Sequence, residues 1–336
     1  MEKKVVLTGI KPTGMPHLGN YLGAIAPALK MAEDENIEAR FFIADYHSLN
    51  TVRDADTLRS YIYEVSASWL AAGLNPDKTF IYKQSDVPET FELTTILMAF
   101  TAKGLMNRAH AYKAAVDANR AKGVSDDHQI NMGLYTYPVL MAADILLFDT
   151  NIVPVGKDQV QHVEMAQDIA QVINHNYKKP LLVIPEARTN ENVMTIPGLD
   201  GRKMSKSYNN HIPLFIPEKK LRKMINKIVT NSQGIEEPKD PETCNVFALY
   251  KLFASEEEQK ALAERYRAGG MGWGEAKAAL FEKINEVVSP MREKYDELMD
   301  DKSRIDRILA DGADKARNAA SKTIKRVRKA VGVELG

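Results

Sequence analysis

The spacing of hydrophobic and polar positions changes roughly two thirds of the way along the chain. Up to about Ile212, short unbroken apolar runs alternate with longer segments in which apolar residues recur at helical spacing. The runs predicted to be strands are Lys4–Thr8, Ala39–Ala44, Thr79–Tyr82, Asn151–Val155 and Leu181–Ile184, which Pro185 ends. The segments predicted to be helices are Gly19–Glu33, kinked or shortened by Pro27, Asp56–Ala72, Glu89–Thr101, Pro138–Phe148 and Gly156–Asn174. This alternation predicts an α/β fold with a Rossmann-like doubly wound parallel sheet.

After about Ile212 the strand-like runs disappear, and Glu, Lys, Ala and Leu at helical spacing continue to the end of the chain. The sequence therefore predicts a Rossmann-like domain at residues 1–212 and an all-α C-terminal domain at residues 213–336. A segment near residues 104–135 interrupts the first domain, and its central part, Ala109–Gly133, is polar and shows no clear strand. We interpret it as a mobile insertion over a site, although a plain surface loop explains the pattern nearly as well.

Composition narrows the class of protein without indicating a function. The 336 residues are enough for two domains, and no apolar run approaches the length that spans a membrane. Cys244 is the single cysteine, which excludes an intramolecular disulfide and fits a reducing, cytoplasmic location. The seven histidines include no H-E-x-x-H or other close metal-ligand pairing, so no metal site is predicted. Because the formal net charge is zero, nucleic-acid binding has to be argued from a local patch.

Residues Thr13–Asn20 follow a predicted strand and lead into a predicted helix. At such a junction, free backbone N–H groups and the helix dipole favour a phosphate group. Gly19 would allow an adenine or ribose to pack against the backbone, and His17 and Asn20 could reach phosphate or sugar oxygens. A tight turn that binds no ligand is the alternative interpretation.

Two basic stretches lie later in the chain. Lys203–Ser207 places two lysines and two hydroxyls around Met204, which suits a polyphosphate; a solvated basic loop is the alternative. Lys315–Lys329 contains seven Lys and Arg residues and no acidic residue. On a helix this stretch would form a surface suited to an RNA backbone, and a solvated helix face explains it equally well.

Together, Pro16–Asn20 and Lys203–Ser207 resemble the two signature sequences of the class I aminoacyl-tRNA synthetases. The first is a variant of H-I-G-H with asparagine in its last position, and the second matches K-M-S-K-S at every position. The resemblance covers nearly the whole chain, and it narrows to the tryptophanyl-tRNA synthetase family through Gly9–Gly14, Gly19–Ala24, Thr136–Leu147 and Val153–Gln159.

The resemblance implies the activity of a tryptophan–tRNA ligase. L-tryptophan and ATP would give tryptophanyl-adenylate and pyrophosphate, and tryptophan would then pass to the 3′ end of tRNA(Trp). ATP is thus implied as a substrate, with Mg²⁺ bound alongside it. The resemblance also implies that the helical domain binds the anticodon and that the protein is a homodimer, because this family binds one tRNA across two subunits.

Roles for individual residues follow from their positions in the matching stretches. Catalytic roles are implied for four residues: Lys203 and Lys206 would neutralise charge on the departing pyrophosphate, Lys11 would contact phosphates, and Asn20 would help to cradle ATP. ATP binding is implied for Lys11, Pro12, Thr13, His17, Gly19, Asn20, Gly156, Lys157, Asp158, Val193, Lys203, Met204, Ser205, Lys206 and Ser207, with the backbone of Val193 facing adenine. Tryptophan binding is implied for Asp144, Met141, Tyr137, Gln159, Val153, Val155 and Leu7.

A chemical argument also supports Asp144. An indole ring has one N–H donor and no acceptor, so a buried pocket for it needs an acceptor with few competing partners. The apolar stretch Val139–Leu147 argues against an exposed or helix-capping aspartate. Finer pocket contacts are less certain to follow the family, because Ala44–Thr51 replaces a D-Q-H-A-I-T-like run, while Lys11 and Ala111 stand at or near positions where glutamine is frequent.

Three other functions stay open at this point. A tyrosyl-tRNA synthetase shares the fold, both signatures and an acceptor for an aromatic donor, although the Leu140–Asp144 run argues against it. A small-molecule adenylyl- or cytidylyltransferase uses a similar front stretch but usually lacks the K-M-S-K-S loop and the long helical tail. A non-catalytic RNA-binding or regulatory paralogue is disfavoured by the presence of Lys203, Lys206 and Asp144.

Overall fold

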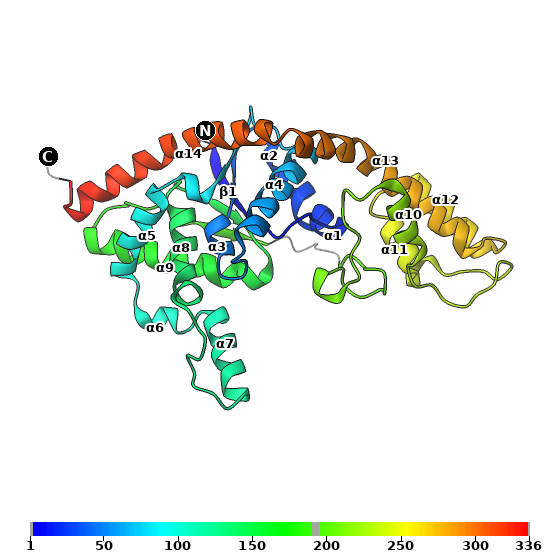
Figure 1. Ribbon diagram of the computed structural model, residues 1–336, viewed down its shortest axis with the longest axis horizontal. Helices are drawn as coiled ribbons and strands as arrows, with labels where there is room; N and C mark the ends of the chain where they lie inside the picture. The colour runs from blue at the N-terminus through cyan, green and yellow to red at the C-terminus, as the bar shows by residue number, and fades with distance from the viewer. Residues whose placement is uncertain (1–2, 190–194, 335–336) are drawn as a thin grey trace.

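One parallel sheet organises the first two thirds of the chain (Figure 1). The computed structural model describes residues 3–189 and 195–334. The five strands in these ranges are β1 (Lys4–Ile10), β2 (Ile37–Ile43), β3 (Phe80–Lys83), β4 (Ile152–Pro154) and β5 (Glu186–Arg188). They pair in parallel in the order β3-β2-β1-β4-β5, which confirms the predicted Rossmann-like doubly wound sheet.

Helices make the crossovers between these strands. Joining β1 to β2 are α1 (Leu18–Asn20), a π-helical turn (Tyr21–Ile25) and α2 (Ala26–Ala32), with Pro27 in the first turn of α2. Joining β2 to β3 are α3 (Asp45–Ser48) and α4 (Ala55–Ala71). Between β3 and β4 lie a 3₁₀ turn (Gln84–Asp86), α5 (Glu89–Phe100), α6 (Lys103–Met106), α7 (His110–Ala121) and α8 (Met132–Leu146). A 3₁₀ turn (Lys157–Gln159) and α9 (Val160–Tyr177) lead from β4 towards β5.

The strand order reverses between β1 and β4. Strands β2 and β3 lie on one side of β1, and β4 and β5 lie on the other. In open α/β sheets, a crevice for ligands forms outside the carboxyl ends of the strands at such a reversal. Lys11 follows β1 directly, and Gly156 comes two residues after the end of β4. The fold therefore places both residues at the mouth of this crevice.

The two faces of the sheet pack against different helices. Because side chains alternate along a strand, Phe41 packs against Trp69 of α4 on one face, and Phe42 packs against Tyr82 in the core of the other. The first core continues into the helical part of the chain. The second core gathers α5, α8, α9 and the small residues of the last helix.

The predicted strand Leu181–Ile184 is wrong, and the fifth strand forms after it. Leu181 and Leu182 are buried, as an interior strand would be. Three of their four backbone polar groups, however, bond to side chains: Asn174 binds both the N–H (2.9 Å) and the C=O (2.8 Å) of Leu182, and Arg326 donates to the C=O of Leu181 (2.9 Å). These side chains supply hydrogen bonds that a neighbouring strand would otherwise supply, so an apolar run is buried without joining the sheet.

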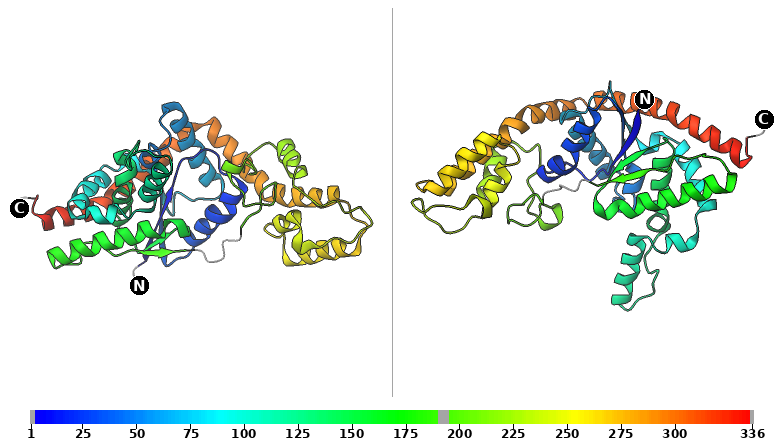
Figure 2. Two further views of the ribbon diagram at one scale, coloured as in Figure 1. Left: turned by 90° about the horizontal axis from the view of Figure 1, so that it is seen from below. Right: turned by 180° about the vertical axis from the view of Figure 1, so that it is seen from behind.

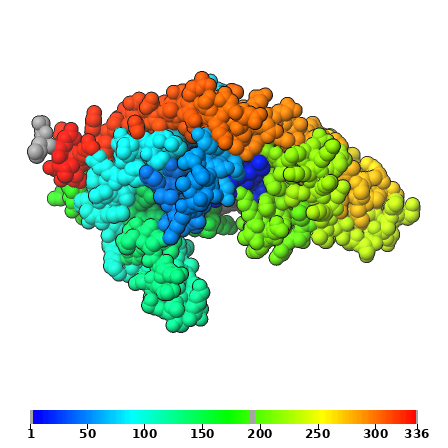
Figure 3. All heavy atoms as spheres, in the orientation of Figure 1, coloured from blue at the N-terminus to red at the C-terminus, as the bar shows by residue number. Residues whose placement is uncertain are grey.

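The inserted segment is more regular than the sequence suggested. Ala109–Gly133 contains all of α7 and the start of α8, so the interpretation as a plain loop is wrong. Asn131 caps α8 by accepting from the N–H of Leu134 (2.8 Å), which starts this helix six residues before the predicted Pro138. The segment around α7 projects from the body of the molecule (Figure 3). Gln161 of α9 fastens its base by accepting from the N–H of His110 (2.8 Å).

The last third of the described chain is helical, as predicted. Its helices are α10 (Glu218–Asn226), α11 (Asn245–Tyr250), α12 (Glu256–Ala268), α13 (Trp273–Asp300) and α14 (Lys302–Val331), with 3₁₀ turns at Lys206–Tyr208 and Pro241–Thr243. Helices α10 to α13 form a lobe beside the sheet domain (Figures 1 and 2). None of the helices described combines the length and apolar character needed to cross a membrane.

Helix α14 leaves this lobe and returns along the sheet domain (Figure 1). It lies so close to the edge strand β3 that a Cβ on Gly312 would sit 1.9 Å from the carbonyl oxygen of Ile81. Ala313, Ala316 and Ala320 continue this contact as buried residues of the second core. The all-α C-terminal region is thus confirmed. The single domain boundary at residue 212 stays a prediction, and the final helix packs against the sheet domain.

Several side chains of the basic stretch Lys315–Lys329 bond to the sheet domain. Lys315 and Arg317 donate to the backbone carbonyls of Pro76 (3.0 Å) and Asp86 (2.6 Å). Further along, Arg326 pairs with Asp149 (2.5 Å) and Arg328 with Glu92 (Nε to Oε1, 2.6 Å). Lys322, Lys325 and Lys329 are exposed. The stretch therefore fastens α14 to the sheet domain, and only part of it could meet RNA.

Candidate active site

A cavity of about 560 Å³ opens at the carboxyl ends of β1 and β4. Every residue predicted to bind the amino acid lines it: Leu7, Tyr137, Met141, Asp144, Val153, Val155 and Gln159. Lys11 and Gly156, predicted to contact the nucleotide, line it as well. Helix α8 presents Tyr137, Met141 and Asp144 at spacings of four and three residues, so they share one face of the helix.

Asp144 lies at the buried end of this cavity, and its side chain is 2 % exposed. Its carboxylate accepts from Gln84 Nε2 at 2.9 Å and lies 2.9 Å from His47 Nε2. Burial raises the pKa of Asp144, and the hydrogen bonds from His47 and Gln84 oppose that rise. The expectation of few competing partners is wrong, because two side chains already bind this carboxylate. A carboxylate has about four acceptor sites, so it can still accept from a ligand.

Sequence reasoning did not name His47 or Gln84. His47 lies in α3, just after β2, and Gln84 directly follows β3. Their positions in the sequence could have identified them, because polar residues just after parallel strands gather at the ligand-binding edge of the sheet. The cavity also contains other residues that were not named as site residues, among them Gly9, Phe42, Asn50, Thr51, Ala111 and Ile145.

The front signature forms a helix cap. His17 Nδ1 accepts from the N–H of Asn20 (3.2 Å), and Asn20 Oδ1 accepts from the N–H of His17 (3.1 Å). Burial, with the nearby His211 and Lys206, lowers the pKa of His17 to about 4. The ring is therefore neutral near pH 7, and because Nδ1 accepts, Nε2 carries the proton and can donate to a phosphate oxygen.

Glycine at position 19 also lies close to the ring of His17 in its own signature. A Cβ there would lie 2.9 Å from His17 Nδ1 and 3.5 Å from the Cβ of Met204. The His17 ring would have to shift to admit a side chain, whereas the distance to Met204 is an ordinary contact. The predicted contact of Gly19 with the nucleotide stays a prediction. Met204 is 4 % exposed, so its side chain anchors the second signature in the hydrophobic core.

The structure brings the segments that carry the two signatures together. Lys206 Nζ donates to the carbonyl of Thr13 (2.7 Å), and Leu18 and Ile212 share a backbone hydrogen bond (2.9 Å). Burial lowers the pKa of Lys206, and Glu64 opposes that shift. Lys206 of the second loop therefore lies against the turn that follows β1.

Hydrogen bonds from a buried residue support the backbone of the second loop, while some of its side chains are exposed. Buried Asn210, which sequence reasoning missed, accepts from the N–H of Ser205 (2.8 Å) and donates to the carbonyl of Lys203 (3.1 Å). The hydroxyls of Ser205 and Ser207 bond to each other (2.8 Å). Exposed residues are Lys11, Thr13, Lys203, Lys157 and Asp158, while Pro12 is buried in the turn. Val193 lies outside the described residues.

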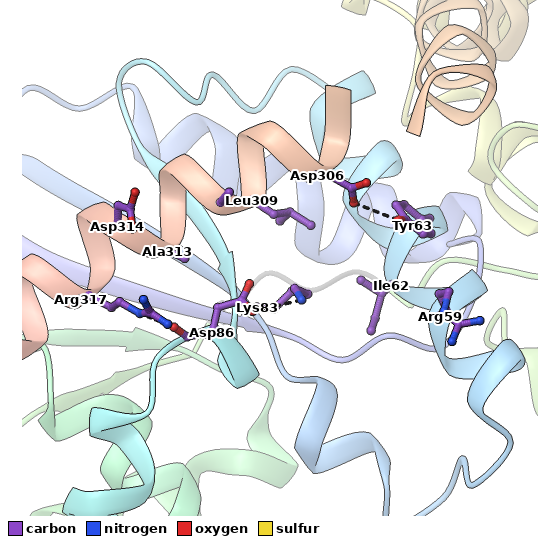
Figure 4. A pocket seen from close by; sticks show the side chains of 11 residues that line it. Arg59, Ile62, Tyr63, Lys83, Asp86, Asp306, Leu309, Ala313, Asp314 and Arg317 are labelled. Atoms are coloured by element: carbon purple, nitrogen blue, oxygen red, sulfur yellow. Dashed lines mark hydrogen bonds and ion pairs between the residues drawn. The ribbon is translucent and has the colours of Figure 1, made fainter. Parts of the chain in front are cut away.

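A second cavity, of about 530 Å³, lies where α14 crosses the end of β3 (Figure 4). Several of its polar residues bond to one another or to the backbone: Tyr63 donates to Asp306 (2.9 Å), Lys83 pairs with Asp86 (3.1 Å), and Arg317 donates to the Asp86 carbonyl. None of the predicted site residues lines it. These contacts connect α14, α4 and the turn that carries Gln84.

Comparison with known proteins agrees with this geometry. Residues 1–289 match the family described as tRNA synthetases class I (W and Y). The tryptophan–tRNA ligase of Neisseria meningitidis serogroup A is 50 % identical over 334 residues, covering 99 % of both chains. The enzyme of the same name from Bordetella parapertussis is 52 % identical over 98 % of this chain and 73 % of its own. The chain belongs to the tryptophanyl-tRNA synthetase family.

The fold of the chain also matches that of a solved structure from this family. The tryptophanyl-tRNA synthetase of Campylobacter jejuni, in complex with ADP and tryptophan, superposes with a TM-score of 0.89 at 46 % identity, covering 98 % of this chain and 99 % of that one. Within residues 3–189 and 195–334 of the present chain, there is no group of three or more His, Cys, Asp and Glu side chains that could hold a metal ion.

Proposed function

We propose that this chain is a tryptophan–tRNA ligase that activates L-tryptophan with ATP and transfers it to tRNA(Trp). The observation that carries the proposal is a buried acceptor, Asp144, in a cavity whose mouth lies at the turn after β1, the turn that Lys206 of the second signature contacts. This arrangement gives one end of the site to an aromatic donor and the other to a polyphosphate.

The indole N–H would bind Asp144. Leu7, Met141 and Val153 supply the apolar walls of the same cavity. A site built around a hydrogen bond to a substrate N–H rejects an analogue that lacks it by ~10⁴–10⁵-fold, so phenylalanine would be excluded strongly. Tyr137 and Gln159 line the cavity further along and would bind the α-ammonium group, which needs acceptors.

The nucleotide would lie across the turn at Lys11–Asn20, opposite the second loop. A carboxylate oxygen of tryptophan would attack the α-phosphorus, and the bond from that phosphorus to the bridging oxygen of pyrophosphate would break. Lys203 and Lys206 would neutralise charge on the departing pyrophosphate, and Nε2–H of His17 would donate to a phosphate oxygen. Mg²⁺ would arrive with ATP, held by phosphates and water, and would neutralise further phosphate charge.

The tRNA would contact the helical lobe through α10. The exposed lysines Lys219, Lys220 and Lys223 of α10 and Lys227 directly after it form no ion pair with any described side chain. Leu221 and Ile225 are buried against the lobe, so the lysines occupy the outward face. A concentrated positive face on a chain with zero formal net charge suits an RNA backbone.

A homodimer would form through the face around α3, α5 and the start of α8. Four large apolar side chains are exposed there: Tyr46 (45 %), Leu49 (46 %), Met98 (44 %) and Met132 (68 %). All except Met132 line a shallow groove of about 350 Å³. An apolar patch rimmed by polar residues is typical of a protein interface. Sedimentation equilibrium that found only a 37.6 kDa species at micromolar concentration would contradict the dimer.

The activity is tested by amino-acid-dependent exchange of labelled pyrophosphate into ATP, measured with each of the twenty amino acids. We expect exchange with tryptophan alone, and we expect Lys206→Ala to slow it far more than it weakens tryptophan binding. Exchange with tyrosine instead would support the tyrosyl-tRNA synthetase alternative. Absence of exchange with any amino acid would support a non-catalytic paralogue.

A further inference from the structure

A buried histidine stands behind the cavity and does not line it. His162, in the first turn of α9, is 2 % exposed. Both of its ring nitrogens are engaged: Nε2 is hydrogen-bonded to the hydroxyl of Tyr137, and Nδ1 lies 3.0 Å from Gln159 Oε1. Tyr137 and Gln159 both line the cavity, so His162 connects two cavity walls from outside.

Asp158 fixes the direction of each hydrogen bond in the series that runs from it through Gln159 and His162 to Tyr137. Asp158 accepts from Gln159 Nε2 (2.9 Å), and an ionised carboxylate can only accept, so the amide nitrogen of Gln159 faces Asp158. The amide oxygen then faces His162, which must donate from Nδ1. A neutral imidazole with its proton on Nδ1 has a bare Nε2, and the Tyr137 hydroxyl must therefore donate to it.

The neutral state of the ring is consistent with its surroundings. Burial lowers the pKa of His162, the nearby His110 and His47 lower it further, and only Asp158 opposes them. Burial also raises the pKa of Tyr137 to about 12, so the phenol keeps its proton. With that proton directed at His162, the oxygen of Tyr137 can only accept from the cavity side, and Gln159 Oε1 keeps a second lone pair.

We propose that His162 is a positioning residue that makes Tyr137 and Gln159 hydrogen-bond acceptors towards the α-ammonium group of the amino-acid substrate. This inference rests on the proposed function. An ammonium group has three donors and no acceptor. If the hydroxyl of Tyr137 pointed its proton into the cavity instead, two donors would face each other. His162 thus selects for an amine without touching it.

The test compares two tryptophan analogues in wild type and in His162→Phe. Tryptamine carries the ammonium but no carboxylate, and indole-3-propionate carries the carboxylate but no ammonium. Isothermal titration with the full-length chain gives both dissociation constants. We expect His162→Phe to weaken tryptamine about 10- to 100-fold, as for the loss of hydrogen bonds to a charged group, and to leave indole-3-propionate within about twofold.

Two further variants separate positioning from general damage to the helix. His162→Gln keeps a side-chain carbonyl that can accept from Tyr137, so it should recover part of the tryptamine affinity, and it carries the test if the phenylalanine variant fails to fold. Val163→Ala, at a fully buried neighbour on α9, should not discriminate between the two analogues. A double-mutant cycle with Tyr137→Phe should show that much of the His162 effect requires the tyrosine hydroxyl.

The outcomes are distinct. Equal weakening of both analogues by His162→Phe would assign the histidine to structure alone, and no weakening of tryptamine would remove it from the site; either result overturns the proposal. Wild-type protein that fails to support tryptophan-dependent exchange would contradict the proposed function itself, which is a separate result.

Discussion

Asp144 and Asp45 are two buried carboxylates with different surroundings. Asp144 lines the cavity, whereas Asp45 does not and instead accepts from the hydroxyl of Ser85 (2.5 Å). We predict that Asp144→Asn weakens tryptophan binding about 10- to 150-fold, because a hydrogen bond to a charged acceptor contributes ~1.5–3 kcal/mol. The new amide would also present donors to Gln84 and His47, which already donate to this position.

Isothermal titration with tryptophan and with ATP checks this prediction. ATP affinity should stay unchanged in Asp144→Asn, and the matched variant Asp45→Asn should keep its tryptophan affinity. Unchanged tryptophan binding in Asp144→Asn would remove this residue from the indole end of the site.

Local sequence could identify Asp144 but not its partners. A carboxylate within a long apolar run has few explanations other than a buried functional one, so Asp144 was accessible from the sequence. His47 and Gln84 lie 97 and 60 residues away along the chain, and only the packing of α3 and the end of β3 against α8 brings them to this carboxylate. Asn210 lies only five and seven residues from its partners Ser205 and Lys203, so it was missed for another reason: the local sequence does not distinguish a buried asparagine from an exposed turn residue.

Among the helices and strands, two predictions failed, each for a different reason. The order of strands and helices in the sheet domain follows from the alternation of apolar runs with helical spacing. Leu181–Ile184 has the composition of a strand, but Asn174 and Arg326 take its backbone groups. Helix α7 carries charged and polar residues on much of its surface, so the polar composition of the segment hid its regular spacing.

The contact between α14 and β3 depends on Gly312. Alanine is favoured over glycine inside a helix by about 1 kcal/mol, so Gly312→Ala would be stabilising if space were available. A Cβ there would lie 1.9 Å from a backbone oxygen of Ile81, which cannot move aside like a flexible side chain. We therefore predict a net loss of stability of about 1–3 kcal/mol as α14 shifts from the sheet edge.

Chemical denaturation of the two proteins measures this loss. Gly274→Ala, in the first turn of α13, is the control, because no atom lies within 4 Å of the Cβ it would add. The control should be neutral or slightly stabilising. Equal stability of Gly312→Ala and wild type would show that α14 can leave β3 without cost.

At the scale of the whole molecule, two groups of exposed lysines are candidate RNA-binding surfaces. One, the α10 group, takes three of the four exposed lysines at α10, namely Lys220, Lys223 and Lys227; the other is Lys322, Lys325 and Lys329, on α14. Several cations of the predicted RNA face at Lys315–Lys329 bind the sheet domain instead, as Arg328 binds Glu92. The α10 group makes no ion pair with described side chains, and we expect it to contribute more to tRNA binding.

The two triple lysine-to-alanine variants remove the same charge, so they control for each other. We predict that the α10 triple variant raises KM for tRNA about tenfold and lowers the slope of log K against log salt by about one for each phosphate that no longer binds a lysine. Tryptophan-dependent pyrophosphate exchange should be unchanged in both variants, because that step requires no tRNA. A larger rise in KM from the α14 triple variant would return the RNA surface to the C-terminal helix, and unchanged KM in both would place it elsewhere on the molecule.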